Sequence, residues 1–299
     1  MVKGMRESRP DKIFQIIVVS FLLLVVFVTM YPLYFVVIAS VSDPDVVNSG
    51  ELTFVPVRPT FEGYGYIFQY RDLWIGYANT VFYAVVGAVF STTLTFFLAY
   101  PLSRKNFSLR KPLTFFVLFT MFFYGGLIPT YLLVRSLGLL NTRAIIIILN
   151  SVVVWNTMIA RTFLQTTVPK ELYEAAVMDG CDHFKYLFRI LIPTSQAIIV
   201  VLLLFYGVAQ WNGFFKALIY LRDESMYPLQ LILREILAST QVTQEMVDAL
   251  NLDDFNERAR QAEMVKYGII LISALPLLAV YPFLQRYFVK GVMIGSVKG

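Results

Sequence analysis

The side chains best suited to recognising another molecule concentrate in residues 168–194, a polar segment between two long apolar runs. Its seven charged residues are Lys170, Glu171, Glu174, Asp179, Asp182, Lys185 and Arg189. Carboxylates in such a segment can accept short, charge-assisted hydrogen bonds from basic or amide donors of a partner. No candidate nucleophile and base recur together in the sequence, and Cys181 and His183 supply only two potential zinc ligands. The chemistry expected here is docking, with no catalytic residue and no metal.

Local signals predict two short helices joined by a tight turn within this segment, which we call the elbow (residues 168–194). Pro169 suits the first position of a helix, where its missing N–H is not needed. Gly180 can adopt the left-handed conformation that ends this helix, and Asp182 can cap the next one. Pro193 is expected to stop the second helix before the following apolar run.

The rest of the chain has the composition of a membrane protein. Hydrophobic residues make up 58% of the 299 residues, charged residues make up 15%, and the mean hydropathy is +0.66. Placing the seven charges of the elbow in mid-bilayer, at about 3 kcal/mol each, would cost roughly 20 kcal/mol. The elbow is therefore expected outside the lipid, held by the helices that flank it.

Six apolar runs are long enough to be membrane spans, which need about 17–25 residues. They are Ile13–Ser40, Gly76–Leu102, Pro112–Val134, Ala144–Ala160, Gln196–Phe215 and Tyr267–Leu284. Each is predicted to be a helix, because an isolated strand would leave its backbone groups unpaired in lipid. The expected fold class is all-α, a polytopic membrane protein with about six transmembrane helices and a cytoplasmic helix-turn-helix loop.

The distribution of Lys and Arg predicts the orientation. Basic residues cluster in the N-terminal arm (1–12), in the loop after the second run and in the C-terminal tail. Short cytoplasmic loops carry the excess of such residues, so these parts and the elbow are expected in the cytoplasm, with both termini inside. The arm is then followed by a single transmembrane domain, residues 13–299.

Two longer segments are expected on the opposite side. Residues 41–75 contain turn signals that lead into a short interfacial helix around 61–68. Residues 222–266 carry more acidic than basic residues, and their helical spacing of apolar side chains involves Leu229, Ile232, Leu233, Ile236 and Leu237. Two interpretations of this apolar face are open. The helix lies on the outer membrane surface or on a partner protein, or its apolar face is buried against the chain's own helices.

The elbow also carries a family resemblance. Glu174-Ala175-Ala176, then Asp179-Gly180, and the Ile192-Pro193 pair resemble the Glu-Ala-Ala loop of binding-protein-dependent ABC importer permeases. Asn79-Thr80 and Trp211-Asn212-Gly213 are similar to the carbohydrate branch of that family, and Tyr227-Pro228-Leu229-Gln230 to its oligosaccharide-transporting, maltose-type members. The resemblance covers nearly the whole chain. Two positions depart from it: Cys181 replaces the usual Ala, and Ala197 replaces a frequent second Pro, which leaves the start of the fifth span open.

The resemblance implies a non-catalytic subunit that translocates a carbohydrate, expected to be an oligosaccharide. Family members pair with a second permease subunit, receive two ABC ATPase subunits at their cytoplasmic loops and meet an extracytoplasmic sugar-binding protein. The chain has no Gly-Lys dipeptide and so no Walker-type phosphate loop. ATP and Mg²⁺ are therefore expected on the partner ATPase, with no cofactor on this chain. The expected location is the cytoplasmic (inner) cell membrane.

The ATPase-coupling site implied by the resemblance comprises Glu174, Ala175, Ala176, Asp179, Gly180 and Pro193. Leu172, Ala176 and Gly180 recur every four residues and share one face, whose small side chains would let the elbow enter a groove on the ATPase. Closure of the ATPase pair would then pull on the elbow and tilt the membrane helices. An ordinary solvated loop is the alternative interpretation.

Amide and aromatic side chains in two predicted spans could line the path of a sugar. They are Asn150, Trp155 and Asn156 in the fourth span and Gln210, Trp211 and Asn212 in the fifth. Sugars offer hydroxyls to amides and apolar ring faces to aromatic rings. Hydrogen bonding between helices, or anchoring at the membrane interface, explains the same residues. The particular sugar does not follow from them.

Other functions fit the sequence less well. An ion-coupled secondary carrier usually places carboxylates within the membrane, whereas the six runs contain no Asp or Glu at mid-depth. A membrane-bound enzyme would need the catalytic groups that the sequence lacks. The net charge of +5 is explained by the basic cytoplasmic loops, so no nucleic-acid partner is needed.

The segment 222–266 is expected to contact the binding protein.

Overall fold

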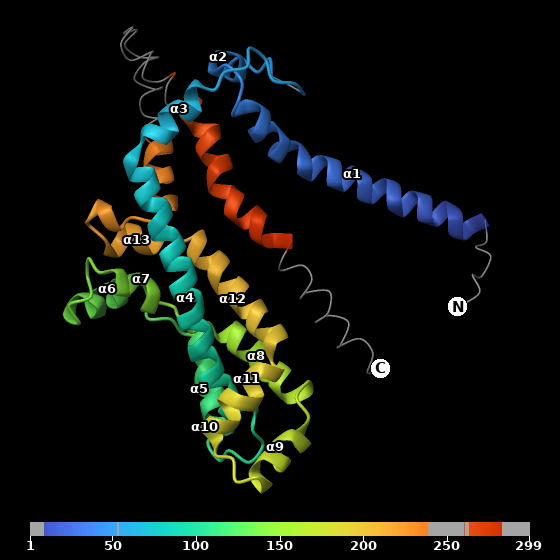
Figure 1. Ribbon diagram of the computed structural model, residues 1–299, viewed down its shortest axis with the longest axis vertical. Coiled ribbons are helices and arrows are strands. Elements are labelled where there is room, and N and C mark those ends of the chain that lie inside the picture. The colour runs from blue at the N-terminus through green and yellow to red at the C-terminus, as the bar shows by residue number, and fades with distance from the viewer. Residues whose placement is uncertain (1–8, 53, 239–259, 261–262, 283–299) are drawn as a thin grey trace. The chain divides into compact units, whose positions relative to one another are not determined.

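The computed structural model describes residues 9–52, 54–238, 260 and 263–282. This part of the chain consists of helices joined by turns and loops, and it contains no strand (Figure 1). The predicted all-α class is confirmed. The chain divides into two compact units, residues 1–70 with 236–274 and residues 71–235 with 275–299, which are described in turn.

The first unit contains four helices among the described residues. They are α1 (Arg9–Ala39), α2 (Pro44–Asn48), α3 (Glu62–Gln69) and the beginning of the helix Glu263–Pro282. A small core joins the end of α1 to the loop after it and comprises Ile38, Ala39, Val47 and Leu52. The short helix predicted around residues 61–68 is present as α3.

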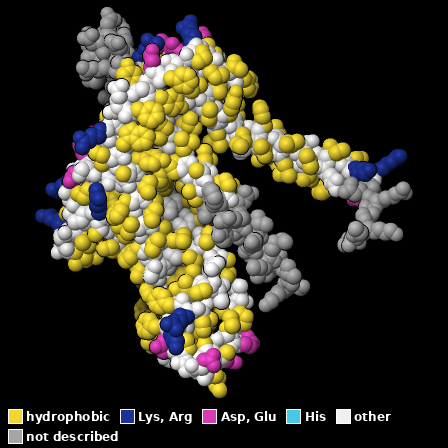
Figure 2. Space-filling model, in the orientation of Figure 1, with side chains coloured by type: hydrophobic (Ala, Val, Ile, Leu, Met, Phe, Trp, Pro, Cys, Tyr) yellow, Lys and Arg dark blue, Asp and Glu magenta, His cyan; other side chains and the backbone are white. Residues whose placement is uncertain are grey.

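Helix α1 has apolar side chains on all of its sides, and Figure 2 shows one of these apolar faces. Most of its large side chains between Ile13 and Val37 are exposed, and the described chain buries no residue of its most apolar stretch. A helix that is hydrophobic on every side is stable only where lipid or another protein covers it. This helix corresponds to the first predicted span.

The second unit is built around α4 (Arg71–Ser103). The other elements are α5 (Arg110–Phe122), α6 (Leu127–Ser136), α7 (Arg143–Ile148), α8 (Val154–Thr166), α9 (Lys170–Met178), α10 (His183–Tyr186), the π-helical turn η1 (Leu187–Leu191), α11 (Ile192–Thr194), α12 (Gln196–Trp211), α13 (Phe215–Tyr220), the 3₁₀ turn η2 (Glu224–Met226) and a helix over 229–238. Helices α8 and α12 pack along α4 (Figure 1). Their shared core includes Phe96, Ala160, Leu202 and Tyr206. Such close-packed interiors transmit displacement from one helix to the next.

Three described helices are long and apolar enough to cross a membrane: α1, α4 and Glu263–Pro282. They correspond to the first, second and sixth predicted spans. Two bent pairs pass the same test together, α5 with α6 at 113° and His183–Thr194 with α12 at 84°. Counting each pair as one span gives up to five among the described residues. The chain is polytopic as predicted, but the six apolar runs are not six straight helices.

The third and fourth predicted spans are each interrupted. Pro112–Val134 breaks after α5, where Gly126 has a φ of +85°. Ala144–Ala160 is divided into α7 and α8, and Asn150 between them has a φ of +62°. Glycine and asparagine are the residues that enter the left-handed region most readily. Average hydropathy detects the apolar surroundings of these runs and is insensitive to such a break.

Side chains satisfy backbone groups that the break between α7 and α8 releases. The Tyr206 hydroxyl accepts a hydrogen bond from the Val153 amide at 3.2 Å and lies 2.7 Å from the Thr95 hydroxyl. The Leu149 carbonyl accepts from the Lys216 ammonium at 3.3 Å. Non-helical backbone is tolerated inside a membrane protein when it is paired in this way.

The beginning of the predicted outer segment 222–266 is attached to α4. The Asn79 amide donates to the Ser225 carbonyl at 2.8 Å and to the Tyr227 carbonyl at 3.1 Å. The Thr80 hydroxyl accepts from the Leu229 amide at 2.7 Å. These contacts hold the backbone of the run Tyr227-Pro228-Leu229 against Asn79 and Thr80.

The apolar face of the helix over 229–238 is turned toward the chain itself. Leu229, Ile232 and Leu233 are all buried. Of the two interpretations of this face, burial against the chain's own helices is correct for these three side chains. Residues 239–259 and 261–262 of the predicted segment lie outside the described residues.

Candidate functional site

The predicted helix-turn-helix is present as a projecting tip of the second unit, formed by α9, α10 and the turn between them (Figure 1). Gly180 follows α9 with a φ of +71°, and the Cys181 amide donates back to the Ala176 carbonyl at 2.9 Å. The Asp182 carboxylate accepts from the Lys185 amide at 2.6 Å and so caps α10. A Cβ added at Gly180 would meet no atom within 4 Å, so backbone conformation alone favours glycine there.

The two sides of α9 have different surroundings. Glu174, Ala175 and Asp179 are exposed, and Met178 is 87% exposed. Ala176 is only 4% exposed, because it packs into the core of the second unit. The prediction that Ala176 belongs to an open face is therefore wrong. The side available to a partner carries Glu174, Ala175 and Met178, and it ends in the charged tip seen in Figure 2.

The second elbow helix ends at Thr194, one residue after Pro193, so it stops before the following apolar run as predicted. Helical backbone continues from His183 through η1 and α11 to Thr194, and the 84° bend falls at Ser195. Pro193 lies in the first turn of α11, directly after the π-helical turn. Proline and π-turns are both established causes of helix bending, so together they direct α12 away from the elbow.

Aromatic contacts attach the elbow to the end of α4. The Tyr100 hydroxyl lies 3.1 Å from His183 Nδ1. The Tyr173 and His183 rings are stacked with centroids 6.0 Å apart, and the Tyr186 ring is stacked on Tyr100 at 6.1 Å. These contacts join α10 to α4 and α9 to α10, so the elbow is packed on the long helix rather than tethered to it by loops.

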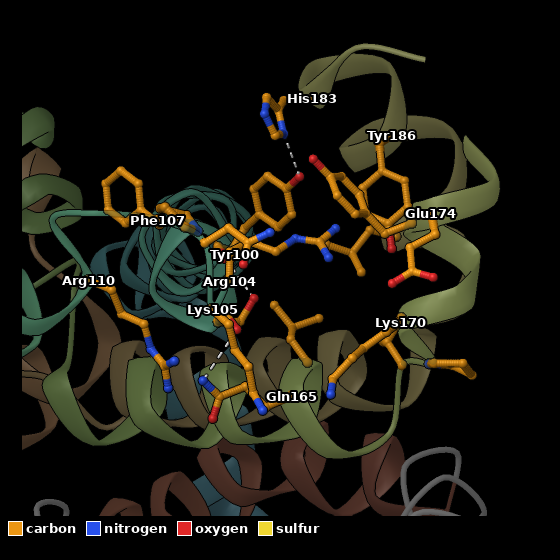
Figure 3. A pocket seen from close by; sticks show the side chains of 18 residues that line it. Tyr100, Arg104, Lys105, Phe107, Arg110, Gln165, Lys170, Glu174, His183 and Tyr186 are labelled. Atoms are coloured by element: carbon orange, nitrogen blue, oxygen red, sulfur yellow. Dashed lines mark hydrogen bonds between the residues drawn. The ribbon is translucent and has the colours of Figure 1, made fainter. Parts of the chain in front are cut away.

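Arg104 extends from the loop after α4 among these rings, and its side chain runs between Tyr100 and Tyr186 in Figure 3. Its guanidinium carbon lies 3.8 Å from the centroid of the Tyr173 ring, 4.8 Å from that of Tyr186 and 5.1 Å from that of Tyr100. Each cation–π contact contributes about 0.5–2 kcal/mol. The three rings hold the guanidinium in place, and its Nε and Nη2 have no acceptor among the described residues.

A pocket of about 610 Å³ lies beside Arg104. The loop between α4 and α5, the end of α8 and both elbow helices contribute to its wall (Figure 3). Four basic side chains line it, Arg104, Lys105, Arg110 and Lys170, against the single carboxylate of Glu174. Of the predicted coupling residues, only Glu174 belongs to this lining.

The residues predicted to line a sugar path are not gathered on one surface. Gln210 is buried, and its amide donates to the Ile146 carbonyl at 3.3 Å. Trp211 is also buried and meets Tyr77 edge to face, with centroids 5.8 Å apart. Asn212 is exposed and donates to the Val208 carbonyl of its own helix at 3.0 Å. Trp211 and Asn212 thus make contacts that stabilise the fold.

The fourth-span members of that set also differ among themselves. Asn156 is buried within α8, whereas its neighbour Trp155 is 63% exposed. Asn150 is exposed at the break between α7 and α8. Of the six residues, Gln210 is hydrogen-bonded to Lys216, and Asn150 directly follows Leu149, whose carbonyl accepts from the same ammonium.

Lys216 in α13 was not among the predicted site residues. Its ammonium donates to the carbonyls of Ile146 at 3.0 Å and Leu149 at 3.3 Å, and to Gln210 Oε1 at 3.1 Å. Burial lowers the pKa of Lys216 to about 8. Within the described residues no carboxylate forms an ion pair with it, so its positive charge is balanced only by dipoles. A lysine directly after an apolar run was the available sequence signal.

Comparison with known proteins gives whole-length similarity. No protein-family model matches the chain. Protein LplC of Bacillus subtilis (strain 168) is 35% identical over 298 residues, covering 100% of this chain and 99% of LplC. The polygalacturonan/rhamnogalacturonan transport system permease protein YtcP of the same organism is 34% identical over 293 residues, covering 97% of this chain and 99% of YtcP.

A solved structure shares the arrangement of helices. It is the crystal structure of a bacterial ABC transporter involved in the import of the acidic polysaccharide alginate. One of its chains matches with a TM-score of 0.83 and 31% identity, covering 95% of this chain and 100% of that chain. None of these descriptions is of an ion-coupled carrier, so that alternative gains no support.

Proposed function

The chain belongs to the carbohydrate ABC importer permeases, and from this premise we propose how its residues couple an ATPase to a substrate path. It is a non-catalytic membrane subunit for the import of oligosaccharides or polysaccharides. Members of the family work with an ATPase and a substrate-binding protein. In the complex we propose, a second permease and two ATPase subunits accompany this chain, and ATP and Mg²⁺ bind to the ATPases.

We assign the elbow to the cytoplasmic side of the inner membrane, with both termini on that side. Support comes from the basic loops that accompany it, because Lys and Arg accumulate in short cytoplasmic loops. On the opposite side, the segment 222–266 is assigned to contact an extracytoplasmic sugar-binding protein. Its first residues are fixed to α4 through Asn79 and Thr80, which gives a docked protein a rigid base.

The ATPase contact is assigned to the exposed side of α9. The observation that carries this proposal is the two-sidedness of the helix: Glu174 and Met178 are exposed, while Ala176 belongs to the core that contains Phe96 of α4 and Leu202 of α12. A partner that displaces α9 therefore displaces the packed helices as well. Asp179 and Gly180 shape the end of α9, and Pro193 sets the direction in which α12 leaves the elbow.

Cysteine crosslinking in the assembled complex tests this assignment. Met178→Cys, in a Cys181→Ala background, should crosslink to the ATPase subunit in inverted membrane vesicles. Val85→Cys is the matched control, because Val85 is 59% exposed but lies midway along α4. Crosslinks from position 178 to an external protein, or equal yields at 178 and 85, would contradict the assignment.

We further propose that the substrate is an acidic oligosaccharide, one that contains uronate units. Lys216 supports this, because its ammonium lies beside Gln210 and the break after Leu149, and no carboxylate of the described residues forms an ion pair with it. A buried cation without a counter-ion attracts anionic and disfavours neutral ligands. The names of YtcP and of the alginate importer describe transport of acidic polysaccharides by related proteins.

The substrate class is tested by stimulation of ATPase activity in the reconstituted complex. Binding protein loaded with oligogalacturonate or alginate oligosaccharide should stimulate hydrolysis, whereas a neutral malto-oligosaccharide of equal length should not. Direct titration of the binding protein with each sugar separates a failure to load from a failure to translocate. Stimulation by the neutral sugar alone would refute the acidic assignment and leave the permease function intact.

A further inference from the structure

The pocket beside Arg104 contains buried hydrogen-bond donors that the proposed coupling role does not use. Arg104 Nε and Nη2 are buried, and neither has a hydrogen-bond partner among the described residues. Tyr186 is 1% exposed, and its hydroxyl is likewise buried without a partner there. Buried donors of this kind are rare in proteins, because leaving one unpaired is costly.

The charges around this pocket are also unbalanced. Arg104, Lys105, Arg110 and Lys170 face a single carboxylate, Glu174, and none of the five forms an ion pair within the described chain. Their positive potential extends to the end of α8, where the pKa of Arg161 is lowered by burial and then by repulsion from Arg110. The loop between α4 and α5 therefore brings like charges together, and no carboxylate of the described residues forms an ion pair with them.

The positions of these groups suit an oxyanion with several acceptor atoms. Arg104 is held by three rings with part of its planar fork free, and such a fork matches phosphate geometry. Lys105 and Lys170 lie across the pocket from His183 in Figure 3, so ammonium groups reach the cavity from two different elements. A volume of about 610 Å³ accommodates a phosphate together with the group that carries it.

We propose that this pocket binds a phosphate group through Arg104, Lys105, Lys170 and the Tyr186 hydroxyl. Two sources share that chemistry: the headgroup of an anionic phospholipid and a soluble phosphorylated compound. The pocket adjoins the end of α4, at the level where basic sites between membrane helices meet lipid headgroups. The ligand would join the loop after α4 to the start of α9, and so stiffen the attachment of the elbow.

The test uses the whole transport complex, reconstituted in phosphatidylcholine nanodiscs with or without phosphatidylglycerol. Retained phosphatidylglycerol is counted by native mass spectrometry, and binding of labelled inorganic phosphate is measured in the phosphatidylcholine discs. Lys105→Gln with Lys170→Gln removes two exposed cations of the pocket. Lys111→Gln with Lys185→Gln is the matched control, since both lysines are exposed near the pocket but outside its lining.

The double variant Lys105→Gln with Lys170→Gln should bind the anion about 30-fold more weakly than wild type. The control double variant, Lys111→Gln with Lys185→Gln, should bind it as wild type does. Arg104→Gln should weaken binding further, and the lysine pair covers the case in which that variant fails to fold. Retention of phosphatidylglycerol that inorganic phosphate cannot displace supports the membrane source, and saturable phosphate binding supports the soluble one. Equal binding by the two lysine pairs would overturn the proposal. The proposal would also be overturned if the Lys105→Gln, Lys170→Gln variant lost the ATPase subunit while its anion binding stayed unchanged. That result would assign the pocket to an acidic surface of the ATPase.

Discussion

The polar side chains at the two ends of α4 differ in how completely they are hydrogen-bonded. Near one end, the Asn79 amide nitrogen donates to two carbonyls, and its oxygen accepts from Arg143 Nη2 at 3.1 Å. At the other end, Arg104 is surrounded by aromatic faces, and two of its buried nitrogens have no acceptor in the described chain. A fully satisfied network fixes one arrangement, whereas an incomplete one keeps hydrogen-bonding capacity for another molecule. The Asn79 end is a structural clamp, and the Arg104 end is the one to which we assign partners.

The largest expected effect is that of a charge reversal at Glu174, on the side of α9 that we assign to the ATPase. Glu174→Arg should reduce both uptake and stimulated ATPase activity by about 30-fold or more, because reversing a charge at a docked surface replaces attraction by repulsion. Glu174→Gln, which removes the charge and keeps the shape, should fall between the variant and wild type. Membrane insertion of all three proteins is checked by their abundance in purified membranes. Normal uptake by a well-inserted Glu174→Arg protein would show that this side of α9 is not the coupling surface.

Breaking the clamp should cost stability rather than coupling. Asn79→Leu leaves the Ser225 and Tyr227 carbonyls and the Arg143 guanidinium without this partner, for a loss of about 2–4 kcal/mol. The measurement is thermal unfolding of the purified protein in detergent. Asn212→Leu is the control, because Asn212 is exposed and its amide bonds only its own helix; its effect should stay below about 0.5 kcal/mol. Similar losses in the two variants would remove the distinction between clamp and surface amide.

Lys216 combines the two conditions: its three N–H donors are hydrogen-bonded, and no carboxylate among the described residues forms an ion pair with it. The pKa of Lys216 is lowered to about 8 by burial, so the ammonium form prevails below that pH and is lost above it. The ratio of ATPase stimulation by acidic over neutral oligosaccharide should therefore fall about tenfold between roughly pH 7 and 9. Lys216→Gln should give a low ratio at every pH. A wild-type ratio that does not change with pH would exclude Lys216 as the source of selectivity.

The smallest expected effect comes from Tyr100→Phe. This change removes the hydroxyl that lies 3.1 Å from His183 Nδ1 and keeps the ring beneath Arg104. One neutral hydrogen bond contributes about 0.5–1.5 kcal/mol, so thermal stability should decline slightly and coupling should persist. Tyr100→Ala, which also removes the ring, should cost clearly more in the same unfolding assay. Equal losses would mean that the aromatic cluster does not hold the elbow on α4.

Residues with local signals were predicted well. Gly180 and Asp182 have the left-handed and capping roles expected of them, because both depend on atoms within a few positions along the chain. The uncharged runs at α1 and α4 are continuous helices for the same reason. The environment of Ala176 was not predicted correctly. Helical spacing shows which residues share a side of α9, but it does not show which side faces the core. Asn150 was noted for its amide, whereas its backbone conformation interrupts a predicted span.

Composition, capping residues and short motifs are properties of neighbouring residues, and they were enough to predict the all-α membrane class, the elbow and the family resemblance. The position of Arg104 among three aromatic rings and the contact of Lys216 with the end of α7 became visible only in the folded chain. Those contacts join residues far apart along the chain, and hydropathy contains no information about such pairs. Whether a charge is satisfied or left available depends on the groups that folding brings to it.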